Sequence, residues 1–499
     1  MDGKPDVWRI ECVTKQPLLT GFPSTVFASA KRRLQAALRG SCALIRSRSL
    51  AGYAVLFEDV LPGAFLQGID PICRQRSFGH LPVFWAWLAQ ILEANASCQK
   101  AVGLLQSWCR ACALPVPSSS TASYCRARQR LSEGFLQGVH QRILTHLRGR
   151  CHERDQWKGF TLKAIDGSSV QLMDTDENQS AYPQPSGQKP GCGLPTMGIE
   201  GLLGLGHGAW EHFVTCHHTQ HDSKAAAALL GHLQQGDLLL ADRAFCTYEI
   251  IARSLAQGAH VLMRLHQSRA KALDWPQGRR TGPSERQVVW KRPPHRSGST
   301  LSPEQWDTLP ESLTLRMLRV RRRTREGGQD DLIVVTTLLN ARTHDGGELA
   351  ALYARRWEIE LKLRDLKTTL GMEFFAVKSA QLAHKTLWMS VIAFNLVRSL
   401  MQRAAAREEM PVWHLSFKGV LDLVVASQES SRVHAGHPQT RAAALSQWLE
   451  ICATKLIDQR PQRREPRAVK RRPKTYPLLT SPRHLYNEIT HRNRYHAIA

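Results

Sequence analysis

The sequence predicts a multi-domain α/β protein, and three observations lead to this fold class. Between residues 151 and 265, short apolar runs of strand composition alternate with segments of helical composition. Residues 266–340 hold further runs of strand composition, separated by basic turns rich in Pro and Gly. Apolar residues recur at helical spacing in residues 1–150 and again after residue 346.

The expected elements follow one another in a regular order. In the α/β region we expect short strands at Phe160–Ile165, Phe213–His217, Gly236–Ala241 and His260–Leu265, and helices at Ser223–Leu233 and Thr247–Leu255. The β-rich region should hold strands at Gln287–Lys291, Leu313–Val320 and Leu332–Leu338. Later helices are expected at Gly347–Leu370 and Leu382–Ala404.

The net charge indicates a polyanionic partner. The 499 residues include 67 Lys and Arg against 42 Asp and Glu, a formal charge of +25. Each phosphate that such a protein neutralises releases bound counterions, which favours nucleic-acid binding. Length and the absence of long lysine-rich tracts argue against a ribosomal or chromatin protein. The basic segments Ala28–Ser47 and Asp458–Lys474 are candidate DNA contacts, although a solvated tail explains the second equally well.

Localisation and domain organisation follow from similar arguments. No apolar run spans a bilayer, no signal segment is visible, and the 12 Cys lack framework spacing, so we expect a cytoplasmic protein with reduced thiols and no membrane partner. We expect a helical N-terminal DNA-binding region (1–150), a core in two parts (151–265 and 341–405), a β-rich insertion (266–340) and a basic C-terminal region (406–499). A plain helical bundle is the alternative for residues 1–150.

Two aspartates are candidates for metal chemistry. Asp166 and Asp242 each end a short apolar run and precede a turn-like segment. In open α/β sheets, ligands collect beyond the strand ends, so two carboxylates there could share divalent metal ions. A capping Asp after a strand is common, and either residue alone would be weak support.

The segment after Leu349 places polar residues on one side of an expected helix. Tyr353, Arg356, Glu360 and Lys367 fall at roughly 0°, 300°, 340° and 320° around a helix that turns about 100° per residue. A carboxylate flanked by cations and a phenol suits a metal site that faces phosphates. A charged surface helix with an Arg356–Glu360 pair explains the same pattern.

The spacing Tyr-x2-Arg-x3-Glu-x6-Lys resembles the signature of the insertion-sequence-four family of DDE transposases. Trp357 matches the aromatic residue that usually follows the Arg. Similar stretches surround both aspartates, AIDGSSVQLMDTDENQSAYPQPSGQKPGCGLP at 164–195 and GDLLLADRAFCTY at 236–248, and VKRRPKTYPLL at 469–479 also resembles the family. The resemblance covers most of the chain and has its motifs in the same order.

The resemblance implies a ribonuclease H-like catalytic core interrupted by the β-rich insertion. It implies that Asp166, Asp242 and Glu360 bind two Mg²⁺ ions, with Mn²⁺ as a substitute, and that Tyr353, Arg356 and Lys367 contact transposon-end DNA. It further implies metal-dependent cleavage at terminal inverted repeats, strand transfer into target DNA, a homodimer on two double-stranded DNA ends, and a bacterial, nucleoid-associated protein.

Other interpretations remain open at this point. Some family members pass through a DNA hairpin, which needs an aromatic side chain to hold a flipped base. Trp290 is the candidate, and a Trp buried between strands is the alternative. A metal-dependent nuclease that does not join DNA, or a non-catalytic DNA-binding repressor of transposition, would share much of this sequence.

Overall fold

The computed structural model describes residues 52–69, 78–94, 96–111, 115–217, 222–266, 269–270, 278–295, 299–323, 329–427, 438–457, 481–482 and 485–486. The basic segments expected at Ala28–Ser47 and Asp458–Lys474, and the stretch at 469–479, lie outside the described residues.

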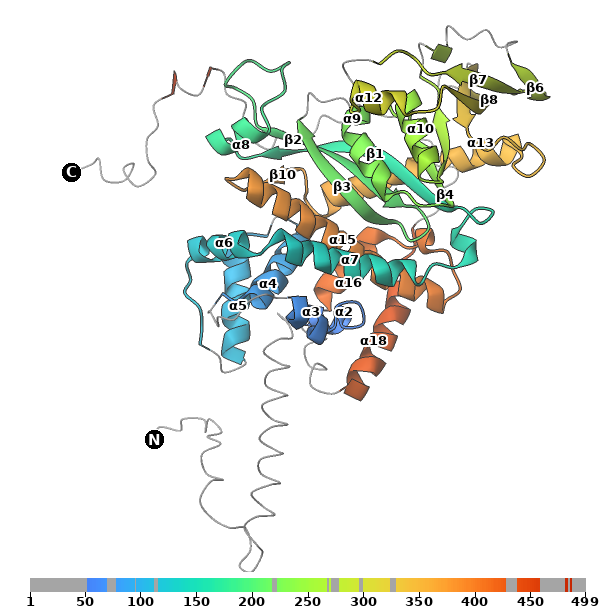
Figure 1. Cartoon of the computed structure of the whole chain (residues 1–499). Helices are drawn as coiled ribbons and strands as arrows, with labels where there is room; N and C mark the ends of the chain where they lie inside the picture. Colours follow the sequence, from blue (N-terminus) through green and yellow to red (C-terminus); the bar gives the residue numbers. More distant parts are fainter. Residues whose placement is uncertain are drawn as a thin grey trace, which may run out of the picture.

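One mixed sheet forms the centre of the described chain (Figure 1). Its first strands, β1 (Thr161–Leu172), β2 (Thr196–Gly204) and β3 (Ala209–His217), are antiparallel neighbours. Strands β4 (Asp237–Ala241) and β5 (His260–Arg264) follow on the other side of β1 and run parallel to it. The resulting order, β3-β2-β1-β4-β5, is the ribonuclease H-like arrangement that we expected.

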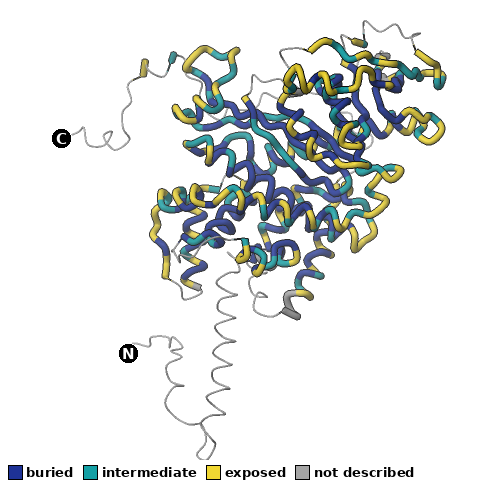
Figure 2. Tube along the Cα trace, viewed as in Figure 1, coloured by how far each residue is buried: buried dark blue, intermediate teal, exposed yellow. Residues whose placement is uncertain are grey.

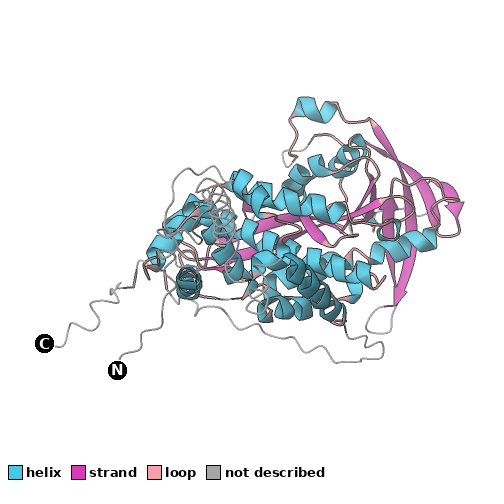
Figure 3. Cartoon of the chain, turned by 90° about the horizontal axis from the view of Figure 1, so that it is seen from below, coloured by secondary structure: helices cyan, strands magenta, loops and turns pink. Residues whose placement is uncertain are grey.

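The strands of the expected insertion continue this sheet. β9 (Gln329–Thr336) pairs antiparallel with β5, and β8 (Ser312–Arg323), β7 (Glu285–Lys291) and β6 (Arg279–Gly282) follow in that order. Figure 3 shows the strands of the insertion twisted at one end of the molecule. The short β10 (Phe374–Phe375) pairs parallel with the end of β1. The insertion and the core therefore share main-chain hydrogen bonds through β5 and β9.

Helices cover both faces of the sheet. One face packs on α15 (Ala380–Arg407) and α7 (Glu133–Arg148). Five further helices surround these two: α4 (His80–Leu92), α5 (Cys98–Ala111), α6 (Thr121–Arg130), α16 (Phe417–Ala426) and α18 (Pro438–Ala453). The shorter helices α2 (Tyr53–Phe57) and α3 (Gly63–Ile69) lie beside them. The opposite face packs on α9 (Asp222–Ala226), η3 (Ala227–His232) and α10 (Tyr248–Ala256). The remaining helices include α8 (Asp176–Ala181) and α12 (Pro303–Asp307).

The side chains of β1 show the two faces directly. Leu162 and Ala164 belong to the hydrophobic core that includes α15, whereas Ile165 belongs to the core that includes α10. This alternation follows from the pleat of a strand, which sends successive side chains to opposite faces. Figure 2 shows the buried sheet and α15 beneath exposed loops.

The apolar helix α15 carries polar residues, and these residues hold other elements. The side chain of Asn395 accepts a hydrogen bond from the backbone N–H of Trp210 (3.0 Å) and donates one to the backbone carbonyl of Trp210 (2.8 Å), on the edge strand β3. Arg398 is fully buried and donates to the carbonyl of His207 (3.1 Å). Buried polar groups need such partners, so the polar positions fix how α15 sits against the sheet. Among the helices that the structure describes, none has the length and apolar character needed to cross a membrane.

Candidate active site

The register of the sheet brings the two aspartates together. Ala164 of β1 pairs with Leu240 of the parallel strand β4 at the end of this ladder, and Asp166 and Asp242, each two residues further along, are close enough to interact electrostatically. Both side chains point to the face that is covered by α15, because Ala164 and Leu240 belong to that core. The site therefore starts as a pair of carboxylates on adjacent strands.

The expectation that Asp166 ends its strand was wrong. β1 continues to Leu172, because β2 pairs with it antiparallel from Lys163 to Gln171. Asp166 lies where β1 leaves β4 but stays paired with β2. The segment after Asp166 is therefore a strand and not a turn, and a Cβ at Gly167 would lie 2.5 Å from Oε1 of Glu200.

Asp242 behaves as the sequence predicts. It directly follows the buried strand β4, and its Oδ1 accepts a hydrogen bond from the backbone N–H of Ala244 (2.7 Å), which turns the chain. Asp166 uses its Oδ1 similarly, accepting from the N–H of Gly167 (2.9 Å).

The signature residues do not lie on one regular helix, contrary to our expectation. α13 (Gly346–Ala354) ends after Tyr353, α14 (Trp357–Arg364) begins after Arg356, and the π-helical turn η4 (Asp365–Thr369) holds Lys367. Asp345 caps α13 by accepting from the N–H groups of residues 347 and 348 (2.8 and 3.1 Å). The angular positions calculated at 100° per residue therefore do not hold, because the break between α13 and α14 and the π-helical turn each change the rotation per residue.

Arg356 joins the first and third carboxylates. Its Nη2 donates to Oε1 of Glu360 (2.9 Å), and its Nη1 lies 3.7 Å from Oδ2 of Asp166. The three side chains are 14%, 35% and 21% exposed for Arg356, Glu360 and Asp166. The guanidinium thus occupies the space between a carboxylate of β1 and a carboxylate of α14.

The carboxylates repel one another. Burial, together with the nearby charges of Asp242 and Glu360, raises the pKa of Asp166 to about 6, although the Gly167 N–H and the Arg356 charge act in the opposite direction. A partly buried acid near two other acids is a site where a cation is stabilising. The donor atoms also fit, because hard divalent ions prefer carboxylate oxygens.

The carboxylates do not yet form a coordination shell. Within the residues that the structure describes, no three His, Cys, Asp or Glu side chains are gathered closely enough to hold a metal ion. The position of Arg356 explains this for Asp166 and Glu360, because its guanidinium separates the two.

Tyr353 lies beside this group. It is buried, and burial raises the pKa of its phenol to about 12, with Arg356, Asp242 and Arg264 as charged neighbours. The phenol therefore stays protonated at neutral pH and can donate a hydrogen bond.

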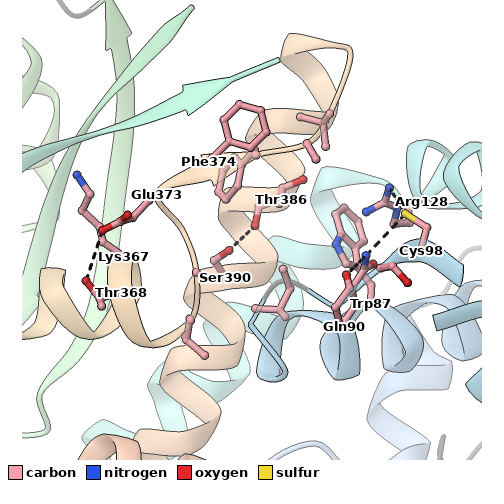
Figure 4. Close-up of a pocket in the computed structure, with 18 residues that line it drawn as sticks. Trp87, Gln90, Cys98, Arg128, Lys367, Thr368, Glu373, Phe374, Thr386 and Ser390 are labelled. Atoms are coloured by element: carbon pink, nitrogen blue, oxygen red, sulfur yellow. Dashed lines mark hydrogen bonds between the residues drawn. The ribbon is translucent and has the colours of Figure 1, made fainter. Parts of the chain in front are cut away.

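The two other predicted DNA contacts are Lys367 and Trp290. Lys367 lines a cavity of about 550 Å³ between the N-terminal helices and the core, and the described residues that line it include none of the three carboxylates (Figure 4). Trp290 of β7 is half-buried against the core that includes α10, with the Arg269 guanidinium 5.0 Å from its ring centroid.

Sequence reasoning missed Arg264. Ala241 of β4 pairs with Met263 of β5, so the next residues of the two strands, Asp242 and Arg264, are neighbours at the same edge of the sheet. The signal was present, because Arg264 ends an apolar strand as Asp242 does.

The strand order is that of a ribonuclease H-like fold, and a pair of carboxylates at its centre is typical of enzymes of this fold that act on nucleic acids. The family model described as "Transposase DDE domain" matches residues 157–396, which contain all of these residues. Residues 157–396 therefore form a DDE transposase domain, and the similarity to a transposase of the insertion-sequence-four type supports an enzyme of DNA transposition.

Two further similarities accompany this match. The chain is 27% identical over 384 residues to the transposase InsG of insertion sequence element IS4 from Escherichia coli (strain K12), covering 74% of this chain and 80% of that protein. A piggyBac transposase, solved as a synaptic complex with hairpin DNA, is 10% identical, with a TM-score of 0.42 over 83% of this chain and 87% of that one. Enzymes of this family generally use divalent metal ions.

Proposed function

We propose that this transposase cleaves DNA at the inverted repeats of its own element and joins the ends to target DNA, with Asp166, Asp242 and Glu360 as ligands for two Mg²⁺ ions. Mn²⁺ is the expected substitute. The observation that carries the proposal is the alignment of Asp166 with Asp242, together with the link from Asp166 to Glu360 through Arg356. When bound there, the metal ions would supply the positive charge that activates a water or a 3′-OH and stabilises the leaving oxygen.

Arg356 has two alternative partners in this proposal. Without DNA, its guanidinium bridges Asp166 and Glu360. A DNA phosphate also offers a pair of anionic acceptor oxygens that a guanidinium can bind with two hydrogen bonds, so Arg356 can leave the carboxylates and bind the phosphate. We therefore expect Arg356→Gln to tighten Mn²⁺ binding in the absence of DNA, as measured by titration calorimetry. Unchanged or weaker binding would contradict the exchange.

The remaining polar residues are proposed as phosphate contacts. Tyr353 donates from a protonated phenol, and Arg264 and Lys367 contribute positive charge. Two ends must be cut together, so we propose a homodimer that holds both ends at the bacterial nucleoid. Trp290, beneath the Arg269 guanidinium, is proposed to receive a flipped base if excision passes through a hairpin.

A cleavage and strand-transfer assay tests the metal triad. Labelled DNA with the element's terminal repeats is incubated with the full chain and Mg²⁺ or EDTA, beside Asp242→Ala, Glu360→Gln and Glu358→Gln. Glu358 is the matched control, because it lies on the same helix as Glu360 and pairs with Arg355 (2.7 Å). Cutting and joining should need Mg²⁺, should disappear in the first two variants and should persist in the third.

Each other result points to a different function. Cutting without joined products would favour a nuclease. Binding of ends by the wild type without any cutting would favour a repressor. If Glu360→Gln cuts as well as Glu358→Gln does, the assignment of Glu360 is wrong.

A further inference from the structure

Two cysteines meet at the junction of α5 and α6, away from the carboxylates. Cys98 is the first residue of α5, Cys125 lies within α6, and their Sγ atoms are 3.9 Å apart. Both side chains are half-buried, and Cys98 lines the 550 Å³ cavity that also contains Lys367 (Figure 4). A solute that enters this cavity can therefore reach Cys98, whose Sγ lies 3.9 Å from that of Cys125.

Hydrogen-bond donors surround the two sulfurs. Nη2 of Arg128 lies 3.3 Å from Sγ of Cys125 and 3.5 Å from Sγ of Cys98, and Nε2 of Gln90 lies 3.7 Å from Sγ of Cys98. Figure 4 shows Gln90 and Arg128 directed at Cys98 from two neighbouring helices.

Arg128 cannot easily turn away. It is buried, and its guanidinium carbon lies 5.2 Å from the Trp87 ring centroid and 5.1 Å from that of Tyr124. Stacking on two aromatic rings fixes a guanidinium in place. The positive charge is therefore built into the site.

This arrangement favours one thiolate in the pair. A hydrogen bond from Cys98 lowers the pKa of Cys125 to about 5, against burial and with help from the Arg128 charge. The same hydrogen bond, together with burial, raises the pKa of Cys98. A thiolate beside a thiol is the arrangement of reactive dithiols, because the thiolate is the nucleophile.

We propose that Cys98 and Cys125 are a reversible oxidation site, which hydrogen peroxide converts to a disulfide. The Cys125 thiolate attacks one peroxide oxygen, the O–O bond breaks, and the departing hydroxide takes a proton to form water. Sulfur of Cys98 then attacks the sulfenic acid at Cys125, forming the S–S bond, and the hydroxyl leaves with the Cys98 proton as a second water. Two thiols lose two electrons, and the peroxide gains them.

Oxidation would change the cavity wall in two ways. A covalent bond would join α5 to α6, and the loss of the thiolate would leave the Arg128 charge uncompensated on the wall shared with Lys367. The site would thus become more attractive to anions when oxidised. This inference does not depend on the roles proposed for the carboxylates.

Chemical labelling of the full chain tests the proposal. Iodoacetamide is added to the reduced protein over a range of pH, and alkylation of each cysteine is followed by mass spectrometry. Cys151 is the internal control, because it is also half-buried but donates to the Leu147 carbonyl, and burial raises its pKa to about 11. At pH 7 we expect Cys125 to react at least about tenfold faster, even though a low-pKa thiolate is a weaker nucleophile.

Peroxide treatment supplies the second measurement. Stoichiometric hydrogen peroxide should give a Cys98–Cys125 linked peptide that dithiothreitol removes, and in Cys98→Ser a sulfenic-acid probe such as dimedone should label Cys125. The proposal is overturned if the linked peptide is absent and both thiols are recovered unmodified. It is also overturned if Cys125 alkylates no faster than Cys151.

Discussion

Replacing Asp166 with Asn should stabilise the metal-free protein while removing its activity. Asp166 is only 21% exposed, and burial together with two acidic neighbours raises its pKa from 3.8 to about 6. Asn has no charge to bury, can still accept the bond from the Gly167 N–H, and leaves the Arg356–Glu360 pair intact. Cleavage should fall more than about 100-fold, because the amide is a poor ligand for a hard cation.

The size and the pH dependence of the stabilisation follow from this pKa. A folded-state pKa of about 6 against 3.8 when unfolded means that the folded protein binds the proton more tightly between these values. The free energy of unfolding therefore falls as pH rises from about 4 to about 6. Above pH 6 the protein bears the full cost of ionising the buried carboxyl group. At about 1.4 kcal/mol per pKa unit, the cost approaches about 3 kcal/mol. The Asn variant escapes it, so its advantage should be full at pH 8 and vanish near pH 4.

Thermal unfolding in EDTA measures this difference. At pH 8 the Asn variant should melt a few degrees above the wild type, and the gap should narrow below pH 6. Adding Mg²⁺ should stabilise the wild type more than the variant. Asp174→Asn is the control, because its side chain can still accept the bond from Gln179 (3.0 Å). A variant that is less stable at pH 8, or a gap that is independent of pH, would refute the reasoning.

Three further substitutions test other parts of the structure. Arg264→Gln should weaken binding of transposon ends by about 10- to 100-fold, the loss of one charge-assisted bond, and should reduce the slope of log affinity against log salt by about 1; an unchanged slope would place Arg264 away from DNA. Asn395→Ala leaves the buried Trp210 N–H without its acceptor and should cost about 1–3 kcal/mol, seen as a lower melting temperature; no change would mean that water replaces the amide. Trp290→Ala should slow excision by about 5- to 100-fold without weakening end binding, since stacking of one base contributes about 1–3 kcal/mol; equal excision rates would assign Trp290 to packing alone.

The sequence predicts best where the signal is local. The run from Gly236 to Ala241 is short, apolar and followed by Asp242, and the structure contains that strand and the turn after it. The strands of the insertion were also expected within a few residues of their observed bounds. In each case the side chains that bury the strand lie within the run itself.

The sequence predicts poorly where a distant partner decides the conformation. Asp166-Gly167 has the composition of a turn, but β2 pairs across it and extends β1 to Leu172. The carboxylate of Glu200, more than 30 residues later, lies where a Cβ of residue 167 would be. Arg264 was overlooked for a related reason, since only the register of β4 with β5 places it beside Asp242. Register between strands is set by the whole sheet and not by any one segment.

The two interpretations of Arg356 that the sequence left open are compatible. An ion pair between Arg356 and Glu360 is present, as expected for a charged helix with residues four apart. An ordinary surface pair would be exposed and would involve only these two residues. Here the Arg356 side chain is only 14% exposed, and its guanidinium also lies near Asp166 on β1. Helical spacing cannot reveal this second contact, because it depends on how α14 packs against the sheet. The guanidinium that pairs with Glu360 therefore also compensates the charge of Asp166 on the sheet, and a metal ion that replaces it must compensate both carboxylates.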